Sequence, residues 1–384
     1  MHNDYASPVN TPFSWWEKCF WDKVDVAVAG AGITGLQVAD AIKRRNPDWR
    51  VIVLERDPLA LGASSRNAGF ACFGSLTEFL EDIDRGGEAA ALELAEKRYR
   101  GLQRLREKMG DQAIGFQRSG SLEVFITRER EAQAIDRLET VNRLFEGITG
   151  ESETLRPEPT QGLNMQVTAL GIRNTHEGVV ESDLLLKSLR QRALEAGVEL
   201  YGGMEIARVE AATDGMEIQA GRHAIRARQI VWCTNAWAGK FLPFDSHAPA
   251  RGQVLVTRPV EGLKLNGAYF FNAGYTYFRT LKGNRLLLGG FRDVDPEGEH
   301  NFSPETGGAV WEALNAFLYD VILPGKSAEI DMAWGGTMSM GVHRAPRVER
   351  IDANQVICAG MSGMGVALAA QVAEDAAQIV CEDR

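Results

Sequence analysis

The sequence contains few cysteines, and none is placed for a disulfide framework or a zinc site. The five thiols are scattered over 384 residues without a C-x-x-C pair, and their number is odd. This usage indicates reduced cysteines in a cytoplasmic protein. The first residues, 1–4, lack the basic and apolar regions of a secretory signal, which favours the same location. The cysteines are Cys19, Cys72, Cys233, Cys358 and Cys381.

Positive charge and long apolar runs are also scarce. Lys and Arg number 42 against 52 Asp and Glu, so the formal net charge is −10. Such a chain has no electrostatic footprint for nucleic acid or an anionic membrane, and we expect neither as a partner. No run approaches the ~18 apolar residues of a membrane span. The six histidines show no metal-site spacing, so no metal is predicted.

The chain does contain enough apolar and small residues for two hydrophobic cores. It is 45% hydrophobic and has 40 glycines, which is typical of a globular protein of two domains. An aromatic arm precedes the first domain and carries Phe13, Trp15, Trp16, Phe20 and Trp21. We expect this arm to pack on the body or at a subunit contact rather than to lie on a membrane.

A strand, a glycine-rich turn and a helix open the first domain. Residues 24–29 are apolar and valine-rich, which predicts a short buried strand. Gly30, Gly32 and Gly35 follow at the G-x-G-x-x-G spacing. These glycines allow a tight turn, close approach of a pyrophosphate and close packing of the next helix, respectively. The phosphates would lie at the positive N-terminus of that helix.

A second strand and an acidic residue complete this unit. Residues 51–54 are apolar, and Glu55 follows them twenty residues after Gly35. A carboxylate at this position accepts hydrogen bonds from a ribose diol. The sequence therefore predicts a site for an adenine dinucleotide. The alternative is a buried βαβ unit without a ligand, because a G-x-G-x-x-G run alone is a weak signal.

The last segment repeats this arrangement near the other end of the chain. Residues 355–360 predict a strand, 361–365 a glycine-rich loop, and 366–381 an apolar helix. A second helix N-terminus thus opens on a loop suited to close backbone approach. One long ligand that spans both glycine-rich sites is the simplest interpretation.

Two further segments carry candidate site residues. The loop 62–69 combines small residues with Arg66 and Asn67, which favours backbone pressed against a flat, anionic ligand over a solvated loop. The segment 275–290 predicts a hairpin, and period two places Tyr277 and Arg279 on one face with Tyr275. That face is either a pocket wall or a structural ladder.

In several motifs the sequence resembles the D-amino-acid oxidase superfamily of FAD-dependent oxidoreductases. It is most similar to the branch with gamma-glutamylputrescine oxidase, glycine oxidase and sarcosine oxidase. The likeness covers nearly the whole chain, so chance is a poor explanation for it. It rests on residues 13–16, 30–35, 62–69, 251–254, 334–336, 343–346 and 360–365.

The resemblance implies an α/β fold with a discontinuous, Rossmann-like FAD-binding domain and a second α+β substrate domain on a mixed or antiparallel sheet. An arm at 1–23 precedes them. The FAD-binding domain takes residues 24–80, 176–245 and 334–384, and the substrate domain takes 81–175 and 246–333.

The resemblance also implies which residues contact FAD. Glu55 would hold the adenosine ribose, with Arg56 and Ile206 beside the adenine. The C-terminal loop would hold the isoalloxazine ring, and the remaining residues would follow the pyrophosphate and ribityl chain. Those residues and the loop are Gly30, Gly32, Ile33, Thr34, Gly35, Ser64, Ser65, Arg66, Asn67, Ala68, Gly69, Thr234, Asn235, Ala236, Gly360, Met361, Gly363, Met364 and Gly365.

The reaction implied is oxidation of a carbon–nitrogen bond of an amine or amino acid. Hydride passes to flavin N5, the imine hydrolyses, and O₂ reoxidises the flavin to give H₂O₂. Three alternatives stay open. One is an FAD dehydrogenase of the same fold that uses a quinone or carrier protein, another is a flavin-binding protein without turnover, and the last is a nicotinamide dehydrogenase.

The chain departs from the family pattern at the substrate end. Amino-acid oxidases of this superfamily have an arginine shortly after the glycine pair of the last segment, but residues 335–340 here contain none. An amine, or an acid bound by Arg279, is therefore expected as substrate. His343 is a candidate base, against the alternative of a histidine hydrogen-bonded to backbone.

The flavin is expected to be bound without a covalent link. Neither Cys nor His occurs in residues 361–365, which leaves Cys72 as the one thiol expected near the ring. No feature of the sequence predicts an oligomeric state.

Overall fold

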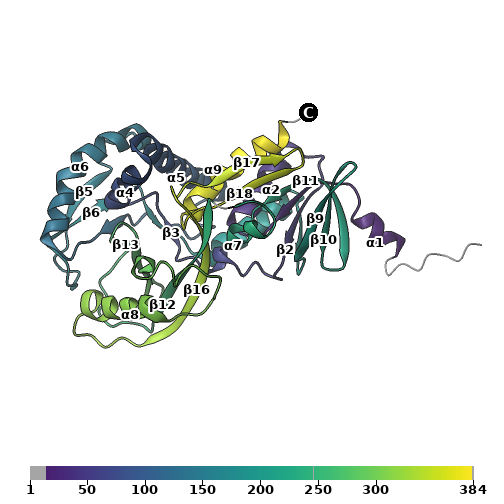
Figure 1. Ribbon diagram of the computed structural model, residues 1–384. Helices are drawn as coiled ribbons and strands as arrows, with labels where there is room; N and C mark the ends of the chain where they lie inside the picture. The colour runs from purple at the N-terminus through teal and green to yellow at the C-terminus, as the bar shows by residue number, and fades with distance from the viewer. Residues whose placement is uncertain (1–13, 245, 383–384) are drawn as a thin grey trace, which may run out of the picture.

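Two large sheets organise the part of the chain that the computed structural model describes, residues 14–244 and 246–382 (Figure 1). The first has strand order β17-β18-β11-β1-β2-β8, with the β9–β10 hairpin joined to β11. Neighbours from β18 to β8 are parallel, and β17 is antiparallel to β18. The bounds are β1 Val24–Ala29, β2 Val51–Glu55, β8 Glu199–Gly202, β9 Ile206–Ala212, β10 Gly215–Ala220, β11 His223–Trp232, β17 Arg347–Asp352 and β18 Gln355–Ala359.

The central strands of this sheet are buried on both faces. Along β1, Val26 and Val28 face a core shared with the helices, whereas Ala27 and Ala29 face a core shared with the β9–β10 hairpin. This explains the continuous apolar run of β1, since a strand covered on both faces needs no polar side. The helices of the first core are α2 Ile33–Arg45, α5 Glu88–Met109, α7 Ser182–Glu195 and α9 Gly365–Cys381.

Glycines let the helices of this core approach closely. A Cβ added at Gly35 would overlap the carbonyl oxygen of Gly30, so α2 packs directly on the turn that precedes it. A Cβ at Gly101 in α5 would overlap the carbonyl oxygen of Ala367 in α9. The third glycine of the G-x-G-x-x-G run therefore has the packing role that its spacing predicts.

The second sheet has strand order β16-β12-β15-β14-β13-β4-β6-β5 and is antiparallel except between β4 and β13. Two cores cover it. One includes α8 Gly308–Ala316 and the other α4 Leu76–Gly86 and α6 Arg128–Thr149. The bounds are β4 Ser121–Glu123, β5 Leu155–Pro159, β6 Leu170–Asn174, β12 His247–Thr257, β13 Ala268–Phe271, β14 Thr276–Leu281, β15 Arg285–Gly290 and β16 Ile330–Gly341.

The α/β class with mixed sheets is confirmed, and so is the hairpin of β14 and β15. One predicted domain boundary, between residues 333 and 334, is misplaced. It falls inside β16, which pairs with β12 from Ile330 to Gly341. The chain therefore leaves the second sheet only after Gly341. The glycine pair at 335–336, taken from sequence as the start of the last segment, lies within that long strand.

The aromatic arm packs on the body only in part. Residues 1–13, Phe13 among them, lie outside the described ranges. In the short helix α1 Trp15–Phe20, the side chains of Trp15 and Trp16 are 70% and 79% exposed. Trp21, just after the helix, is buried, and its ring centre lies 5.0 Å from that of Tyr201.

Within the described ranges, no helix is long and apolar enough to cross a bilayer. The same part of the chain has no group of three or more His, Cys, Asp or Glu placed to hold a metal ion. All five cysteines are free thiols.

The buried carboxyl group of Glu177 links the chain around Phe73 and Gly74 with Ser121 at the start of β4, in the region between the two large sheets. The small sheet of β3 Phe70–Ala71 and β7 Gly178–Val179 lies there, and Glu177 precedes β7. Glu177 accepts hydrogen bonds from the backbone N–H of Phe73 at 2.7 Å and of Gly74 at 2.9 Å, and from the hydroxyl of Ser121. Burial raises the pKa of Glu177 to about 7, although these hydrogen bonds oppose the shift.

This raised pKa predicts a pH-dependent stability. The folded state holds the Glu177 proton more tightly than the unfolded state, so the stabilisation is complete below pH ~4.5 and is lost as pH rises through about 7. Glu177→Gln keeps the acceptor oxygen and removes the titration. Between pH 5 and 8, the urea midpoint of the wild type should fall relative to that of Glu177→Gln, by the equivalent of roughly 2 kcal/mol. Parallel pH profiles of the two proteins would contradict this role.

Candidate functional site

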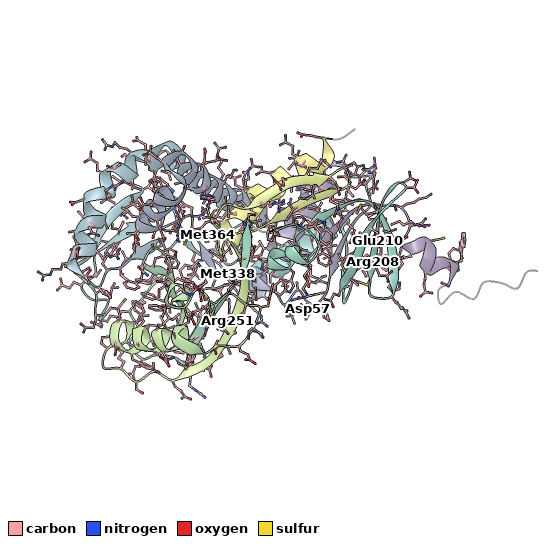
Figure 2. All side chains as sticks on the ribbon, in the orientation of Figure 1. Asp57, Arg208, Glu210, Arg251, Met338 and Met364 are labelled. Carbon is pink, nitrogen blue, oxygen red and sulfur yellow. The ribbon has the colours of Figure 1, made fainter. Side chains whose placement is uncertain are left out.

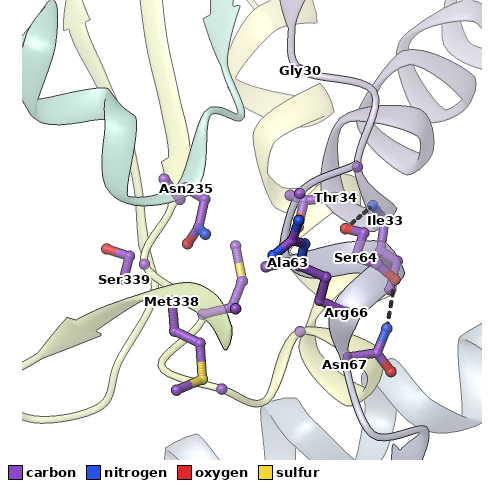
Figure 3. Close-up of a pocket in the computed structure, with 18 of the residues that line it drawn as sticks. Gly30, Ile33, Thr34, Ala63, Ser64, Arg66, Asn67, Asn235, Met338 and Ser339 are labelled. Carbon is purple, nitrogen blue, oxygen red and sulfur yellow. Dashed lines mark hydrogen bonds between the residues drawn. The ribbon is translucent and has the colours of Figure 1, made fainter. Parts of the chain in front are cut away.

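A cavity of about 870 Å³ is lined by residues of both large sheets and of the loops between them. Figure 3 shows its middle, where the turn after β1, the loop 62–69 and β16 face one another. The N-terminal and C-terminal glycine-rich loops both contribute to its wall. The sequence segments predicted to hold one long ligand thus line a single cavity.

The first glycine turn forms one part of this wall. Gly30 has φ +100°, and a Cβ added at Gly32 would lie 2.7 Å from the hydroxyl oxygen of Ser64. Ser64 accepts a hydrogen bond from the backbone N–H of Ile33 at 2.9 Å (Figure 3). Gly32 is the N-cap residue of α2, and the first turn carries no acidic side chain, so its positive end is not neutralised there. This turn suits a phosphate.

Glu55 lies in the wall at the end of β2. Its Oε2 accepts a hydrogen bond from the N–H of Ala31 at 2.8 Å, and its Oε1 accepts one from Asp57 at 3.1 Å. Each carboxylate oxygen keeps a lone pair for a further donor such as a ribose hydroxyl. Nearby, the guanidinium carbon of Arg56 lies 4.2 Å from the centre of a ring of Trp237, another cavity residue.

The loop 62–69 is fixed by its own polar side chains. It contains the one-turn helix α3 Ala63–Arg66. Arg66 donates a hydrogen bond to the carbonyl of Gly335 at 2.6 Å, which ties the loop to β16. Asn67 accepts hydrogen bonds from the N–H of Gly69 at 2.9 Å and from the hydroxyl of Ser182 at 2.8 Å. These bonds hold the backbone in a fixed shape against the cavity.

The C-terminal loop presents a second open helix end. Gly360, Ser362 and Gly363 all have positive φ, which turns the chain sharply between β18 and α9. The N-cap residue of α9 is Met364; no side chain caps this end, and the first turn has no acidic residue. The positive end of α9 therefore opens toward the cavity that this loop lines.

Two hydroxyl groups in the wall fit a polar ligand. The side-chain oxygens of Thr234 and Ser339 are buried, line the cavity, and have no hydrogen-bond partner among the described residues. Buried polar groups normally have a partner, so a ligand with oxygen or nitrogen atoms is expected there. Asn235 is held beside them with φ +53° by a 2.8 Å hydrogen bond to the carbonyl of Thr337.

The structure brings most of the predicted cofactor residues into the wall. Four lie outside it. Gly35 packs under the turn, Ser65 is exposed, Gly69 lies against Arg279, and Ala236 is buried after β11. Those in the wall are Gly30, Gly32, Ile33, Thr34, Glu55, Arg56, Ser64, Arg66, Asn67, Ala68, Ile206, Thr234, Asn235, Gly360, Met361, Gly363, Met364 and Gly365.

One further part of the wall is largely aromatic, and we call it the chamber: Phe70, Phe270, Tyr275, Tyr277, Arg292 and Arg344. Tyr277 makes no hydrogen bond through its hydroxyl to any described residue. Burial raises its pKa to about 12, so the phenol stays protonated and can donate. The hydroxyl of Tyr275 instead contacts Arg85 at 2.6 Å and Glu81 at 3.2 Å.

The prediction that Arg279 faces the substrate is wrong. Its guanidinium is 3% exposed and lies outside the cavity wall. It donates hydrogen bonds to the carbonyls of Gly69 at 3.0 Å and Val180 at 2.7 Å, and to Glu181 at 3.1 Å. The residue does share a face with Tyr277, but the loop around Gly69 lies against it. Arg279 therefore holds that loop on β14.

The prediction for His343 is also wrong, because its side chain is exposed and does not line the cavity. The next residue, Arg344, is 6% exposed and does line it, with φ +54°. Because the backbone of Arg344 is left-handed, the side chain of Arg344 enters the cavity and that of His343 does not.

Among the cationic and aromatic wall residues that were not predicted as site residues are Trp237, Arg292 and Arg344. Arg344 lies within the run 343–346 that carried the family resemblance, and Arg292 follows the glycine pair at the end of β15. Arg344 and Arg292 thus lie in or next to recognisable sequence motifs, but nothing in the sequence shows that their side chains reach the cavity.

Comparisons with known proteins agree with this geometry. The family model described as "DAO: FAD dependent oxidoreductase" matches residues 25–379. The chain is 26% identical to "Probable oxidoreductase OrdL" of Rhizobium meliloti (strain 1021), over 95% of this chain and 87% of the relative. It is 23% identical to "Gamma-glutamylputrescine oxidoreductase" of Escherichia coli (strain K12), over 89% and 80%.

The fold is shared with a solved glycine oxidase from Geobacillus kaustophilus, at a TM-score of 0.74 and 22% identity, with 93% of this chain and 94% of that chain covered. The predicted resemblance is thereby confirmed. Because the family model covers most of its length, the chain belongs to the DAO family of FAD-dependent oxidoreductases.

Proposed function

We propose that the protein oxidises a carbon–nitrogen bond of a small amine or amino acid, with O₂ as final electron acceptor. The observation that carries this proposal is one cavity in which a site suited to a dinucleotide continues into the aromatic chamber. FAD, when bound, supplies the redox chemistry by accepting two electrons. The chain's own residues bind, orient and shield the substrate.

The chamber suits an amine better than an alcohol. Oxidation of an alcohol needs a base for the hydroxyl proton, whereas a neutral amine can react without one. No histidine is among the described residues that line the cavity. Tyr277, with a pKa of about 12, is not a base near neutral pH. Glu78 also lines the cavity, but it lies 3.2 Å from Arg98 and 3.7 Å from Arg344, so its charge is already paired with two guanidinium groups.

The open end of α9 supports a redox role for this part of the cavity. Partial positive charge there would stabilise negative charge on a ring held against the C-terminal loop. Two of the relatives also have names that refer to an amine compound or an amino acid. Both observations favour the same class of reaction.

We also propose that the cofactor is held without a covalent bond. Cys72 lines the cavity, but burial raises the pKa of its thiol well above the usual value, and Glu177 adds to the effect. The thiolate needed for attachment is therefore disfavoured. Acid precipitation of the yellow protein should leave all of the flavin in the supernatant. Flavin absorbance that remains with the protein pellet would contradict this proposal.

The proposed reaction predicts a defined pattern of flavin reduction. The purified holoprotein would be mixed without oxygen with primary and secondary amines, gamma-glutamylated amines and D-amino acids. At least one of these should bleach the flavin, because only a productively held donor can reduce it. Admission of air should then restore the colour and release H₂O₂.

Three other outcomes are distinguishable. Reduction followed by slow reaction with air but fast reaction with a quinone would indicate a dehydrogenase. If 2-hydroxy acids are added to the panel and they alone reduce the flavin, oxidation of a carbon–nitrogen bond would be contradicted. A flavin that stays oxidised with every donor would indicate a binding protein without turnover.

A further inference from the structure

Two cysteines lie on neighbouring strands of the first sheet, at the strand ends next to the cavity. Strands β11 and β18 are parallel, and Trp232 pairs with Ile357 at the last position of their register. The next pair of residues along the two strands is Cys233 and Cys358. Both cysteines line the cavity. The register therefore brings two thiols to the same part of the cavity wall.

The two cysteine side chains also point to the same face of the sheet. Successive residues of a strand alternate between faces. Trp232 and Ile357 belong to the core beside the β9–β10 hairpin, whereas Cys233 and Cys358 belong to the core beside the helices. The thiol of Cys358 has that of Cys233 as a hydrogen-bond partner, and it also lies 3.6 Å from the carbonyl oxygen of Val372 in α9. The two sulfur atoms thus face each other.

The spacing of neighbouring strands fits a disulfide between these positions. Adjacent strands of a sheet lie about 4.8 Å apart, and the Cα atoms of a disulfide are roughly 4.4–6.8 Å apart. Cys233 lies one residue beyond the end of β11 and just before the 3₁₀ helix η1 Asn235–Lys240. The ladder of strand hydrogen bonds therefore ends beside it, and a small approach of the two Cβ atoms leaves the paired strands intact.

We propose that Cys233 and Cys358 form a reversible disulfide when hydrogen peroxide reaches the cavity of the apoprotein. The sulfur of Cys233 attacks one oxygen of the peroxide, the O–O bond breaks, and a sulfenic acid and water form. The sulfur of Cys358 then attacks the sulfenic sulfur, the S–O bond breaks, and the departing hydroxide takes the thiol proton. Two thiols and one peroxide thus give one disulfide and two waters.

The order of the two steps follows from the surroundings of each sulfur. Cys233 is 9% exposed, and a Cβ added at Gly35, in the first turn of α2, would lie 3.3 Å from its Cβ. The positive end of that helix stabilises negative charge that develops on sulfur. The hydrogen bond with Cys233 and burial raise the pKa of the Cys358 thiol well above its ordinary value. Cys358 therefore reacts second, and its proton leaves with the water.

The disulfide affects both glycine-rich turns. A Cβ added at Gly30 would lie 2.7 Å from the carbonyl oxygen of Cys233, so the first turn rests directly on this residue. Cys358 lies two residues before Gly360, where the C-terminal loop begins. Figure 2 shows Met364 of that loop in the middle of the molecule, between the two sheets. A bond between the two sulfur atoms shifts the backbone under both turns, so the disulfide form should bind FAD less tightly.

The same coupling also acts in the opposite direction. A coupling free energy is reciprocal, so FAD that prefers the dithiol form disfavours the disulfide by the same factor. The bound cofactor also covers thiols that line the cavity. The holoprotein is therefore protected, and the apoprotein is the sensitive form. This inference does not rest on the proposed function, because the peroxide can come from any source.

The test compares the reduced apoprotein and holoprotein after treatment with H₂O₂. Peptide mapping without reductant should find the Cys233–Cys358 cross-link in the apoprotein, and the holoprotein should form it at least about 10-fold more slowly. Titration of the cross-linked apoprotein with FAD, followed by flavin fluorescence, should show binding at least about 10-fold weaker than that of the reduced form. Dithiothreitol should remove the cross-link and restore the affinity.

Cys72→Ala is the matched control. Cys72 is also buried and lines the cavity, but its thiol donates to the carbonyl of Gly178 at 3.5 Å. This variant should form the cross-link as the wild type does. In Cys358→Ala, dimedone should label Cys233 after peroxide treatment, because the sulfenic acid then has no second thiol to react with. A Cys233 without label would contradict the order of the two steps.

Peroxide-treated apoprotein without a bond between Cys233 and Cys358 would overturn the disulfide site, and this result needs no variant. A cross-linked form that binds FAD as tightly as the reduced form would overturn its effect on the cofactor. Neither result would affect the proposed amine oxidation. Conversely, a peroxide-dependent cross-link together with a flavin that no amine reduces would contradict the proposed function and leave the disulfide site standing.

Discussion

Two helix N-termini that open on one cavity are the constraint on which the rest of the structure depends. Strands β1 and β18 are both parallel to β11, so the helices that follow them, α2 and α9, begin at the same edge of the sheet. Ligands of open α/β sheets bind at this edge. Neither helix carries an acidic residue in its first turn, so both positive ends favour an anionic ligand.

For both helix ends to face one cavity, α2 and α9 must pack closely on their neighbours. A second wall must also close the cavity on the side opposite these helix ends. Gly35 and Gly101 allow α2 and α9 to approach their neighbours without a side chain between them. The second sheet supplies the opposite wall through β12, β14, β15 and β16. Arg66 ties β16 to the loop 62–69, and Arg279 ties β14 to the same loop. Two of the arginines that looked functional in sequence thus differ, since Arg66 lines the cavity and Arg279 only supports it.

The parts of the fold that sequence predicted are those set by local pattern. Apolar runs and glycine spacing located β1, α2 and β2, and the turn residues located the hairpin of β14 and β15. Period two put Tyr277 and Arg279 on one face and left open whether it was a pocket wall or a structural ladder; in the structure Tyr277 lines the cavity and Arg279 does not. Arg279 failed because its environment is set by residues 69 and 180, about 200 and 100 positions earlier in the chain. No local pattern reports such a contact.

The cationic residues of the chamber were missed for a related reason. Arg292 and Arg344 are aimed by left-handed backbone, at Phe291 and at Arg344 itself. Such conformations are uncommon outside glycine and are imposed by tertiary packing, here by the contact of Phe291 with Phe317. His343 was a candidate base because of its chemistry, but its side chain is exposed beside this backbone turn. The chemistry of a side chain is readable in sequence, whereas its direction at such a turn is not.

The most direct test of the account is a comparison of two flavins with the apoprotein. FAD reaches both glycine-rich loops, whereas FMN lacks the adenylate half and can reach only one. If one ligand spans the cavity, FAD should bind at one molecule per chain and at least about 100-fold more tightly than FMN, a difference of about 2.7 kcal/mol. Equal affinity for FAD and FMN, or binding of both to the same protein molecule, would contradict the account.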